Sequence, residues 1–436
     1  MQETLTASGV QVEPLLKAPT WERRLSDIFW VNSVAISNDG SRVIGATFLH
    51  NYRHKTGKGL PNVQGRFGVV CFDENVKDPK EPDKPQWIDE YEGWDGVFGV
   101  AISGDGSTAA AGGWNDKNGN GVWGMLRAYN AANGKVLLDE TNIKQRVSWV
   151  SLSQNGLVLA AVADDVYVFF REAGEAFNPV PARLGVAGAA NRYVTNVAIH
   201  PDGTWLAACD KLGHVYVATL DLATASIGPL IRWTAPDKRE IPFLTVAIAA
   251  DANKFIVAGG NSVFLFDFAT FGKGAARADY GIEYDTSKDA PQGISPVDKV
   301  DPARILENVR WAAVSSDAEL VTVVANRHVP VQGSPIERLA GVLVALKPGK
   351  DALELRWAHA MDSYPNCTST DARGQYVAAC DGYPTGKSAK FYLFNKEGVQ
   401  QWYAVTHNMN WPIVISADGR AIAAGSDDGA VYRFVP

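Results

Sequence analysis

The sequence predicts an all-β protein in which eight similar units form a closed ring, and three observations support this. One pattern of apolar residues followed by a turn recurs eight times, at intervals of 46 to 66 residues, as expected for four-stranded repeats with insertions. Large and small side chains alternate within each copy, which is typical of strands. The 41 glycines and 10% aromatic residues favour turns and sheets over helices. The copies begin at Val31, Val97, Val147, Val194, Phe243, Val309, Tyr364 and Asn410.

Each unit is expected to contain four strands. In the first copy Val34 and Ile36 alternate with Ser33 and Ala35, and Asn38-Asp39-Gly40 follows as a tight hairpin turn. The third strands are expected at residues 68–73, 125–130, 166–170, 215–221, 263–268, 342–346, 391–395 and 431–435. A fourth, outer strand often carries a tryptophan, namely Trp87, Trp233, Trp357 or Trp402.

Closure of the ring predicts a role for the N-terminal segment. The last unit ends at Val435-Pro436 with only three strands, and an open ring would expose a sheet edge that natural β-proteins avoid. Residues 19–27, with Trp21 where other outer strands carry tryptophan, are expected to supply the missing strand. Residues 1–436 then form a single eight-bladed β-propeller domain; the alternative is a seven-bladed ring with one degenerate unit.

The repeat resembles the WD-repeat pattern. The segment VISADGRAIAAGSDDGAVYRF at 414–434 carries its strand-turn-strand core, although the Gly-His opening and the closing Trp-Asp pair of that family are missing. The stretches AYNAANGKVLLD (128–139) and LFDFATFGKG (265–274) are similar to the docking segments of quinoprotein-like propellers, which commonly have eight blades. The resemblance implies a β-propeller in which loops between second and third strands share one rim.

Composition and charge exclude several classes. A formal charge of -7 gives no global field for nucleic acid, and no run of about 18 apolar residues indicates membrane insertion. The start, MQETLTASGV, lacks the basic and apolar regions of a secretory signal. We therefore expect a cytoplasmic protein; a periplasmic or secreted location is the alternative if Met1 replaces a removed signal peptide.

Four long loops between second and third strands form a basic arc on one rim, in units 1, 2, 6 and 7, which flank unit 8 in a closed ring. They span residues 49–65, 114–121, 326–339 and 382–390. Within them only Asp116 and Glu337 oppose the basic residues, so the arc is expected to attract an acidic protein partner. Solvated side chains on an unimportant rim are the alternative. The predicted partner-binding residues are His50, Arg53, His54, Lys55, Lys58, Arg327, His328 and Lys387.

A second candidate site lies at the start of the inner strands. Polar and aromatic side chains there could line a pocket at the central channel, or pack blades together. The residues are Asn32, Trp149, Asn196, Arg310, Trp311, Asn366 and Trp411.

Metal and catalytic signals are weak. Asp116, Asn118 and Asn120 resemble the start of a calcium loop, but the twelfth position is Arg127 instead of an acidic ligand. No adjacent cysteines, as quinone-dependent propeller enzymes use, and no GxSxG, HExxH or P-loop motif occurs. We therefore expect no cofactor, with Ca²⁺ as the alternative, and predict no catalytic residue.

Cys367 and Cys380 lie on the two strands of one hairpin. A turn centred near residue 372.5 would place them close together but not directly opposite. A disulfide would then need a small register shift, supplied by one extra residue in this turn. Two buried thiols are the other arrangement.

The leading functional hypothesis is a non-enzymatic interaction scaffold that binds a protein partner through the rim of blades 1, 2, 6, 7 and 8. The alternative, which the resemblance implies, is a quinoprotein-like or lactonase-like enzyme acting at the central channel.

Overall fold

The computed structural model describes residues 15–25, 30–48, 67–76, 78, 80–91, 96–115, 123–186, 194–234, 243–260, 262–272, 282–285, 309–329, 338–350, 352–383 and 389–436. Of Phe48, Phe67, Tyr91, Asn115 and residues 282–285, 327–329 and 338–340, only the backbone is described. Every regular element in these ranges is a strand. None of the described residues forms a helix long and apolar enough to cross a bilayer.

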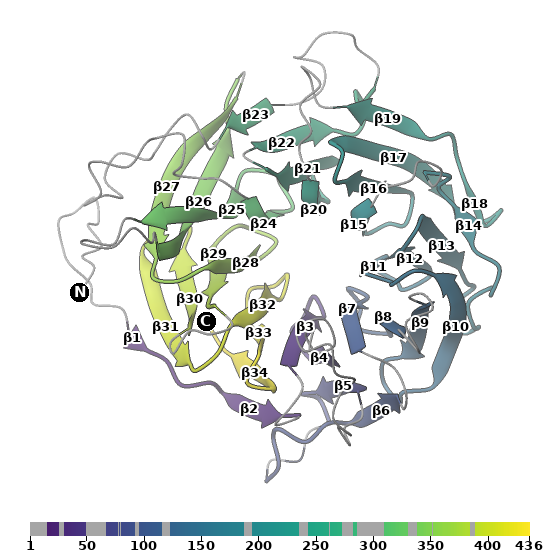
Figure 1. Cartoon of the computed structure of the whole chain (residues 1–436). Helices are drawn as coiled ribbons and strands as arrows, with labels where there is room; N and C mark the ends of the chain where they lie inside the picture. The colour runs from purple at the N-terminus through teal and green to yellow at the C-terminus, as the bar shows by residue number, and fades with distance from the viewer. Residues whose placement is uncertain are drawn as a thin grey trace, which may run out of the picture.

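The strands form eight blades around a central axis (Figure 1). Blade 1 comprises β3 (Trp30–Ile36), β4 (Arg42–Phe48), β5 (Phe67–Asp73) and β6 (Trp87–Tyr91), and blade 2 comprises β7 (Gly96–Ile102), β8 (Thr108–Asn115), β9 (Trp123–Asn130) and β10 (Val136–Lys144). Blade 3 comprises β11 (Trp149–Leu152), β12 (Val158–Val162), β13 (Val166–Phe170) and β14 (Ala182–Arg183). Blade 4 comprises β15 (Val194–Ile199), β16 (Trp205–Asp210), β17 (His214–Asp221), β18 (Ser226–Ile227) and β19 (Ile231–Thr234). Blade 5 comprises β20 (Phe243–Ala249), β21 (Lys254–Gly259), β22 (Ser262–Asp267) and β23 (Ile282–Asp285), and blade 6 comprises β24 (Val309–Val314), β25 (Val321–Val329), β26 (Arg338–Pro348) and β27 (Leu353–Met361). Blade 7 comprises β28 (Pro365–Thr370), β29 (Tyr376–Asp381), β30 (Ala389–Asn395) and β31 (Gln400–Thr406). The strands β32 (Asn410–Ile415), β33 (Ile422–Ser426) and β34 (Ala430–Phe434) belong to blade 8.

The predicted eight-bladed ring is confirmed, and the seven-bladed alternative is wrong. Each of the eight sequence copies supplies one inner hairpin, and no copy is degenerate. Blades 1 and 2 are joined into one continuous sheet by the pairing of Phe48 with Gly96.

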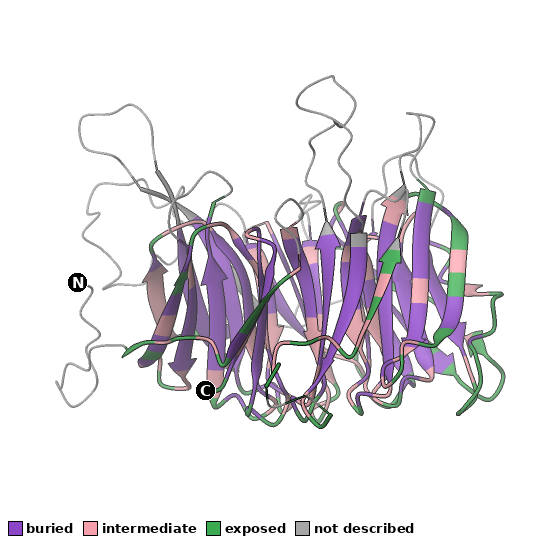
Figure 2. Ribbon diagram, turned by 90° about the horizontal axis from the view of Figure 1, so that it is seen from below, coloured by how far each residue is buried: buried purple, intermediate pink, exposed green. Residues whose placement is uncertain are grey.

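The core is divided among the blade interfaces. The described buried apolar residues form eight clusters, and each cluster lies between two neighbouring blades. Figure 2 shows the resulting buried strands standing side by side across the disc. This follows from the sequence, because strands that face a neighbouring sheet on both sides need apolar residues on both faces.

The N-terminal segment closes the ring as predicted. Strand β2 (Trp21–Arg24) pairs antiparallel with β34, from Trp21 opposite Arg433 to Arg24 opposite Ala430. The Trp21 side chain is buried, its ring lies 4.6 Å from that of Phe72 in blade 1, and its indole nitrogen donates to Glu74 at 2.9 Å. Closure therefore uses packing and a hydrogen bond as well as strand pairing.

A further strand was not expected from the sequence. Leu15 and Leu16 form β1, which pairs in parallel with β31 of blade 7, opposite Trp402 and Tyr403. The chain therefore contributes to the outer edges of blades 7 and 8 before it enters blade 1 (Figure 1).

The hairpin turns of blades 1, 2, 3, 6 and 8 share one hydrogen-bond pattern. In blade 1 the hydroxyl of Ser37 donates to Asp39 at 2.6 Å and accepts from the Arg42 amide at 3.0 Å. Gly40 completes the turn with a φ of +70°, a backbone conformation that favours glycine.

Successive turns are joined into a ring on one face of the disc. Each link is a hydrogen bond from a backbone amide in one turn to a backbone carbonyl in the turn of a neighbouring blade. With the amide residue named first, the links are Asn38 to Gly104 (3.0 Å), Asp105 to Gln154 (2.9 Å), Gln154 to Pro201 (2.7 Å), Asp251 to Ser316 (2.8 Å), Ser316 to Ala372 (2.9 Å), Ala372 to Ala417 (3.0 Å) and Asp418 to Asn38 (3.0 Å). The step from blade 4 to blade 5 is different, because Pro201, which occupies the position from which Gln154 and Ser316 donate, has no amide hydrogen. There the Nε2 of His200 lies 3.1 Å from the carbonyl oxygen of Ala250.

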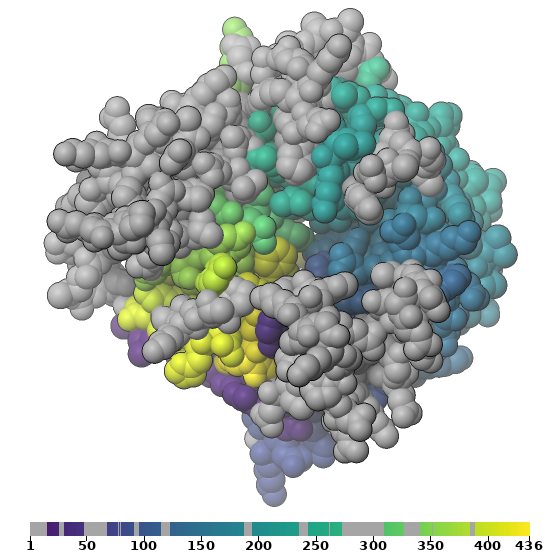
Figure 3. Space-filling view, viewed as in Figure 1, coloured from purple at the N-terminus to yellow at the C-terminus, as the bar shows by residue number. Residues whose placement is uncertain are grey.

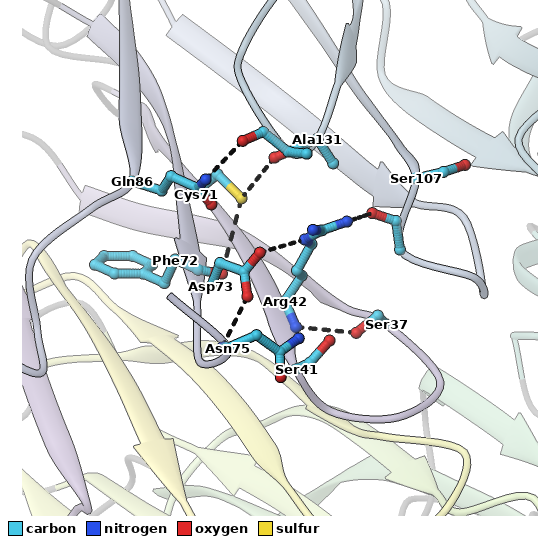
Figure 4. Close-up of polar contacts among 12 residues, drawn as sticks. Ser37, Ser41, Arg42, Cys71, Phe72, Asp73, Asn75, Gln86, Ser107 and Ala131 are labelled. Carbon is cyan, nitrogen blue, oxygen red and sulfur yellow. Dashed lines mark hydrogen bonds and ion pairs between the residues drawn. The ribbon is translucent and has the colours of Figure 1, made fainter. Parts of the chain in front are cut away.

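Side chains reinforce this ring between blades 1 and 2 (Figure 4). The Arg42 guanidinium donates to Asp73 at 2.7 Å within blade 1 and to the carbonyl of Gly106 in blade 2 at 2.6 Å. The thiol of Cys71 lies 3.4 Å from the carbonyl oxygen of Ala131. Burial raises the pKa of this thiol to about 12, so Cys71 stays protonated and acts as a donor.

The sequence expectation for Cys367 and Cys380 needs correction. The two residues are directly opposite, because the turn joins Thr370 to Val377 and is therefore as long as the turn that joins Ile36 to Val43 in blade 1. No extra residue is present. Both are buried free thiols, and they face carbonyl groups of Ile413 and Asn410 in blade 8.

Candidate functional site

The inner strands begin on the face opposite the ring of turns. In seven blades a register shift follows the first residue pair of the inner strand, or the second pair in blades 1 and 2, and it leaves one residue, or two in blade 8, without a partner. Such bulges bend a strand and re-aim a side chain. The bulged residues are Asn32, Phe98, Thr195, Leu244, Arg310, Asn366 and, in blade 8, Trp411 with Pro412. Four of the predicted channel residues therefore occupy bulges.

Three predicted tryptophans meet across the axis. The rings of Trp149 in blade 3 and Trp311 in blade 6 have centroids 4.9 Å apart, and those of Trp311 and Trp411 in blade 8 are 5.6 Å apart. All three side chains are half-buried. Three non-adjacent blades thus contribute to one aromatic cluster at this end of the central channel. The space-filling view shows the described atoms of the blades closing around a narrow centre (Figure 3).

Arg310 lies beside this cluster. Its Cζ atom is 4.9 Å from the ring centroid of Tyr364 and 6.0 Å from that of Trp411. We call the surface formed by Trp149, Arg310, Trp311, Tyr364 and Trp411 the channel mouth. It combines an aromatic floor with one cation from blade 6.

The predicted asparagines have a different environment. Asn32, Asn196 and Asn366 are buried. The amide nitrogen of Asn196 donates to the carbonyl of Leu244 in blade 5 at 3.4 Å, and that of Asn366 donates to Gly382 in its own blade at 3.0 Å. The structure therefore places Asn196 and Asn366 in the channel wall, where they bond the backbone.

Sequence reasoning missed a second stacked arginine. The Cζ atom of Arg146 lies 4.9 Å from the ring centroid of Phe98 and 5.3 Å from that of Trp114. Phe98 occupies the same bulge position as Asn32 and Arg310, so the alignment of the repeats was the signal that could have identified it.

The predicted basic arc falls largely outside the described residues. This applies to His50, Arg53, His54, Lys55, Lys58 and Lys387. The backbones of Arg327 and His328 lie in β25, opposite Ala340 and Leu339, and their side chains are not described. The calcium candidates Asp116, Asn118 and Asn120 also lie outside the described residues.

The described residues near this face include two buried acids. Asp381 accepts hydrogen bonds from Tyr392 and from the amides of Ser363 and Lys390, and burial raises its pKa to about 6. Asp427 follows β33 and has no hydrogen-bond partner for either carboxylate oxygen. Burial, with a smaller effect of Asp428, raises the pKa of Asp427 to about 8. Within the described ranges no group of three His, Cys, Asp or Glu side chains is placed to hold a metal ion.

Comparison with known proteins agrees with this geometry. The family described as "WD domain, G-beta repeat" matches residues 186–217, which lead into β15 and extend through β16 into β17 of blade 4. This segment therefore resembles the WD-repeat family, as the sequence pattern indicated, and the chain as a whole has the fold of an eight-bladed β-propeller. No curated protein sequence matches the chain significantly.

Three solved structures illustrate the similarity of fold. Saccharomyces cerevisiae Sqt1 aligns with a TM-score of 0.63 at 11% identity, over 97% of this chain and 100% of Sqt1. The Dos1 propeller aligns with a TM-score of 0.63 at 9% identity, over 96% and 95% of the two chains. Chaetomium thermophilum Sqt1, bound to the N-terminus of the ribosomal protein L10, aligns with a TM-score of 0.60 at 14% identity, over 94% and 98%. At these identities the similarity concerns the fold.

Proposed function

We propose that residues 1–436 form one domain that acts as a protein-binding scaffold, with the channel mouth at the centre of the binding face. The observation that carries this proposal is the contact of Trp149, Trp311 and Trp411 across the axis. Half-buried indoles offer a large apolar area with a polar tip, and tryptophan and arginine are enriched among residues that dominate binding energy. The aromatic cluster makes the centre of this face a floor on which a partner segment can rest.

Two further points support a protein partner. Chaetomium thermophilum Sqt1, a propeller of similar fold, is bound to the N-terminus of another protein, and we propose that this chain also takes up a segment of its partner. Arg310 and Trp311 come from blade 6, Tyr364 precedes blade 7 and Trp411 belongs to blade 8. These blades belong to the rim on which the sequence places the basic arc, so an acidic partner fits both regions.

The proposal includes the cytoplasm as the compartment. The directly opposed Cys367 and Cys380 are free thiols, and reduced cysteine pairs are typical of that compartment.

Co-purification tests the proposal. The tagged full-length chain is incubated with extract of its source cells, and retained proteins are identified by mass spectrometry. Trp311→Leu removes part of the aromatic floor, whereas Trp357→Leu alters a half-buried tryptophan of outer strand β27 that bonds the carbonyl of Lys396. We expect one partner to be retained by wild type and Trp357→Leu and lost with Trp311→Leu. Equal retention by both variants would contradict the proposed binding face.

A further inference from the structure

We infer that Arg310 is the receptor for a carboxylate on the bound partner, namely an Asp or Glu side chain of a segment that crosses the channel mouth. This inference rests on the proposed function and adds the chemistry that the partner must present. It concerns a described residue and is independent of the basic arc.

The first argument is the position of the guanidinium group. Its Cζ atom lies over both the Tyr364 ring and the Trp411 ring, at 4.9 and 6.0 Å from their centroids. A guanidinium that stacks on aromatic rings uses its flat faces, so its terminal N–H groups remain available for hydrogen bonds along its edge. These edges match the two oxygens of a carboxylate.

The second argument is that this cation has no anionic partner. Three other partly buried arginines are paired: Arg42 with Asp73 at 2.7 Å, Arg127 with Asp89 at 3.0 Å, and Arg433 with Glu74 at 3.4 Å. In the described part of the chain, no carboxylate lies within ion-pair distance of Arg310.

The hydrogen bonds of Arg310 lead to the same conclusion. Its Nε atom is buried without an acceptor, and its terminal nitrogens make no hydrogen bond to any described residue. A partly buried charge without a counter-charge is unfavourable. A carboxylate on the terminal nitrogens would supply the missing anion.

The surroundings favour a carboxylate within a peptide over a phosphate group. Phosphate recognition generally uses clusters of basic residues, whereas the described channel mouth offers one arginine among aromatic rings. In blade 7, Lys390 is already paired with Asp362. A singly charged carboxylate flanked by apolar side chains matches one cation on an aromatic floor.

The surroundings of Arg310 also favour the carboxylate of a partner's side chain over the carboxylate at the partner's C-terminus. Terminal carboxylates are commonly held by nests of backbone amides, and here the donor is a side chain at the edge of a closed floor. A segment that lies across Trp311 and Trp411 would present an Asp or Glu side chain to Arg310 along its length.

Selection from a random twelve-residue peptide library tests the inference. The peptides are displayed through their C-termini, so that no free terminal carboxylate is present, and are selected on wild type, Arg310→Gln and Trp311→Leu. We expect wild type to enrich one Asp or Glu flanked by apolar residues, and Arg310→Gln to lose that acidic preference. A peptide from the wild-type selection is then synthesised with its acidic residue and with the matching amide.

The affinities of these two peptides for wild type and for the Arg310 variants test whether Arg310 binds the acidic side chain. The acid-to-amide change should weaken binding to wild type by about 10- to 100-fold and binding to Arg310→Gln by less than about 2-fold, because a hydrogen bond to a charged group is lost only in the first case. Arg310→Lys, which keeps the charge but not the planar fork, should lie between them. If Arg310→Gln does not fold, the wild-type and Arg310→Lys affinities serve instead. Peptides that bind through Trp311 without an acidic preference would contradict this inference alone, whereas failure of wild type to retain any peptide would contradict the proposed function as well.

Discussion

The imidazole Nε2 of His200 lies 3.1 Å from the carbonyl oxygen of Ala250 in the next blade. A carbonyl oxygen can only accept, so Nε2 is the donor of this hydrogen bond. This hydrogen bond joins the turns of blades 4 and 5, where Pro201 has no backbone amide hydrogen to donate. The other ring nitrogen, Nδ1, lies 2.6 Å from the carboxylate of Asp202. His200 thus replaces, with a side chain, a link that other neighbouring blades make with backbone.

This relationship predicts a specific rescue. His200→Ser should lower the free energy of unfolding by about 1 kcal/mol, the usual net value of one hydrogen bond, because serine is too short to reach Ala250. Adding Pro201→Gln restores an amide at the position from which Gln154 donates to the next blade in the turn of blade 3, Ser153-Gln154-Asn155-Gly156, so it should recover much of the loss. Guanidinium unfolding measures both effects, and His407→Ser at an exposed position is the control. A double variant no more stable than His200→Ser would contradict this role of His200.

Closure of the ring depends on Trp21. Trp21→Ala removes a buried indole that packs on Phe72 and bonds Glu74, so the free energy of unfolding should fall by about 3 to 5 kcal/mol. Trp123→Ala, at a side chain that is 47% exposed, should cost less than about 1 kcal/mol. Thermal and guanidinium unfolding of the two variants compare them directly, and equal melting temperatures would mean that β2 does not hold the ring closed.

Asp427 predicts a pH dependence of stability. Burial raises the pKa of its carboxyl group from 3.8 to about 8 in the folded chain, so the folded state holds a proton that the unfolded state loses near pH 4. Wild-type stability should therefore fall as the pH rises from about 4 to about 8. Asp427→Asn cannot ionise, so its advantage over wild type should be absent at pH 4 and reach about 1 to 3 kcal/mol at pH 8. A difference that is constant with pH would show that Asp427 is not buried as a neutral acid.

The cysteines predict a simple titration result. Cys71, Cys209, Cys367 and Cys380 are buried free thiols, and burial raises the pKa of Cys367 to about 12. They should react slowly in the folded protein, since the thiolate is the reactive form. Denatured, unreduced protein should show four thiols with a disulfide-exchange reagent. Two thiols would indicate a bridge between Cys367 and Cys380 and favour an exported protein.

Much of the fold was predictable because its determinants are local. The repeated turn, as in Asn38-Asp39-Gly40, and the period-two alternation define each hairpin without reference to distant residues. The role of Trp21 was predictable because a ring with three strands in its last blade needs a fourth. Strand β1 was not predictable, since Leu15 and Leu16 are too few to show a periodicity.

The candidate site was only partly predictable. The sequence placed Trp149, Trp311 and Trp411 at the start of inner strands, but whether they meet depends on the diameter of the ring and on the bulges. The stacking of Arg310 on Tyr364 depends on the same geometry. The link made by His200 could not be inferred either, because it requires knowing that Pro201 occupies the position from which Gln154 donates to the next blade.

The measurement that tests the central claim most directly is the dissociation constant of the co-purified partner, determined by calorimetric titration into wild type, Trp311→Leu and Trp357→Leu. The account predicts that Trp311→Leu weakens binding by at least about 2 kcal/mol, as expected for a central aromatic contact, and that Trp357→Leu binds like wild type. Wild-type affinity in the Trp311→Leu variant, with its fold intact, would contradict the claim that the partner binds at the channel mouth.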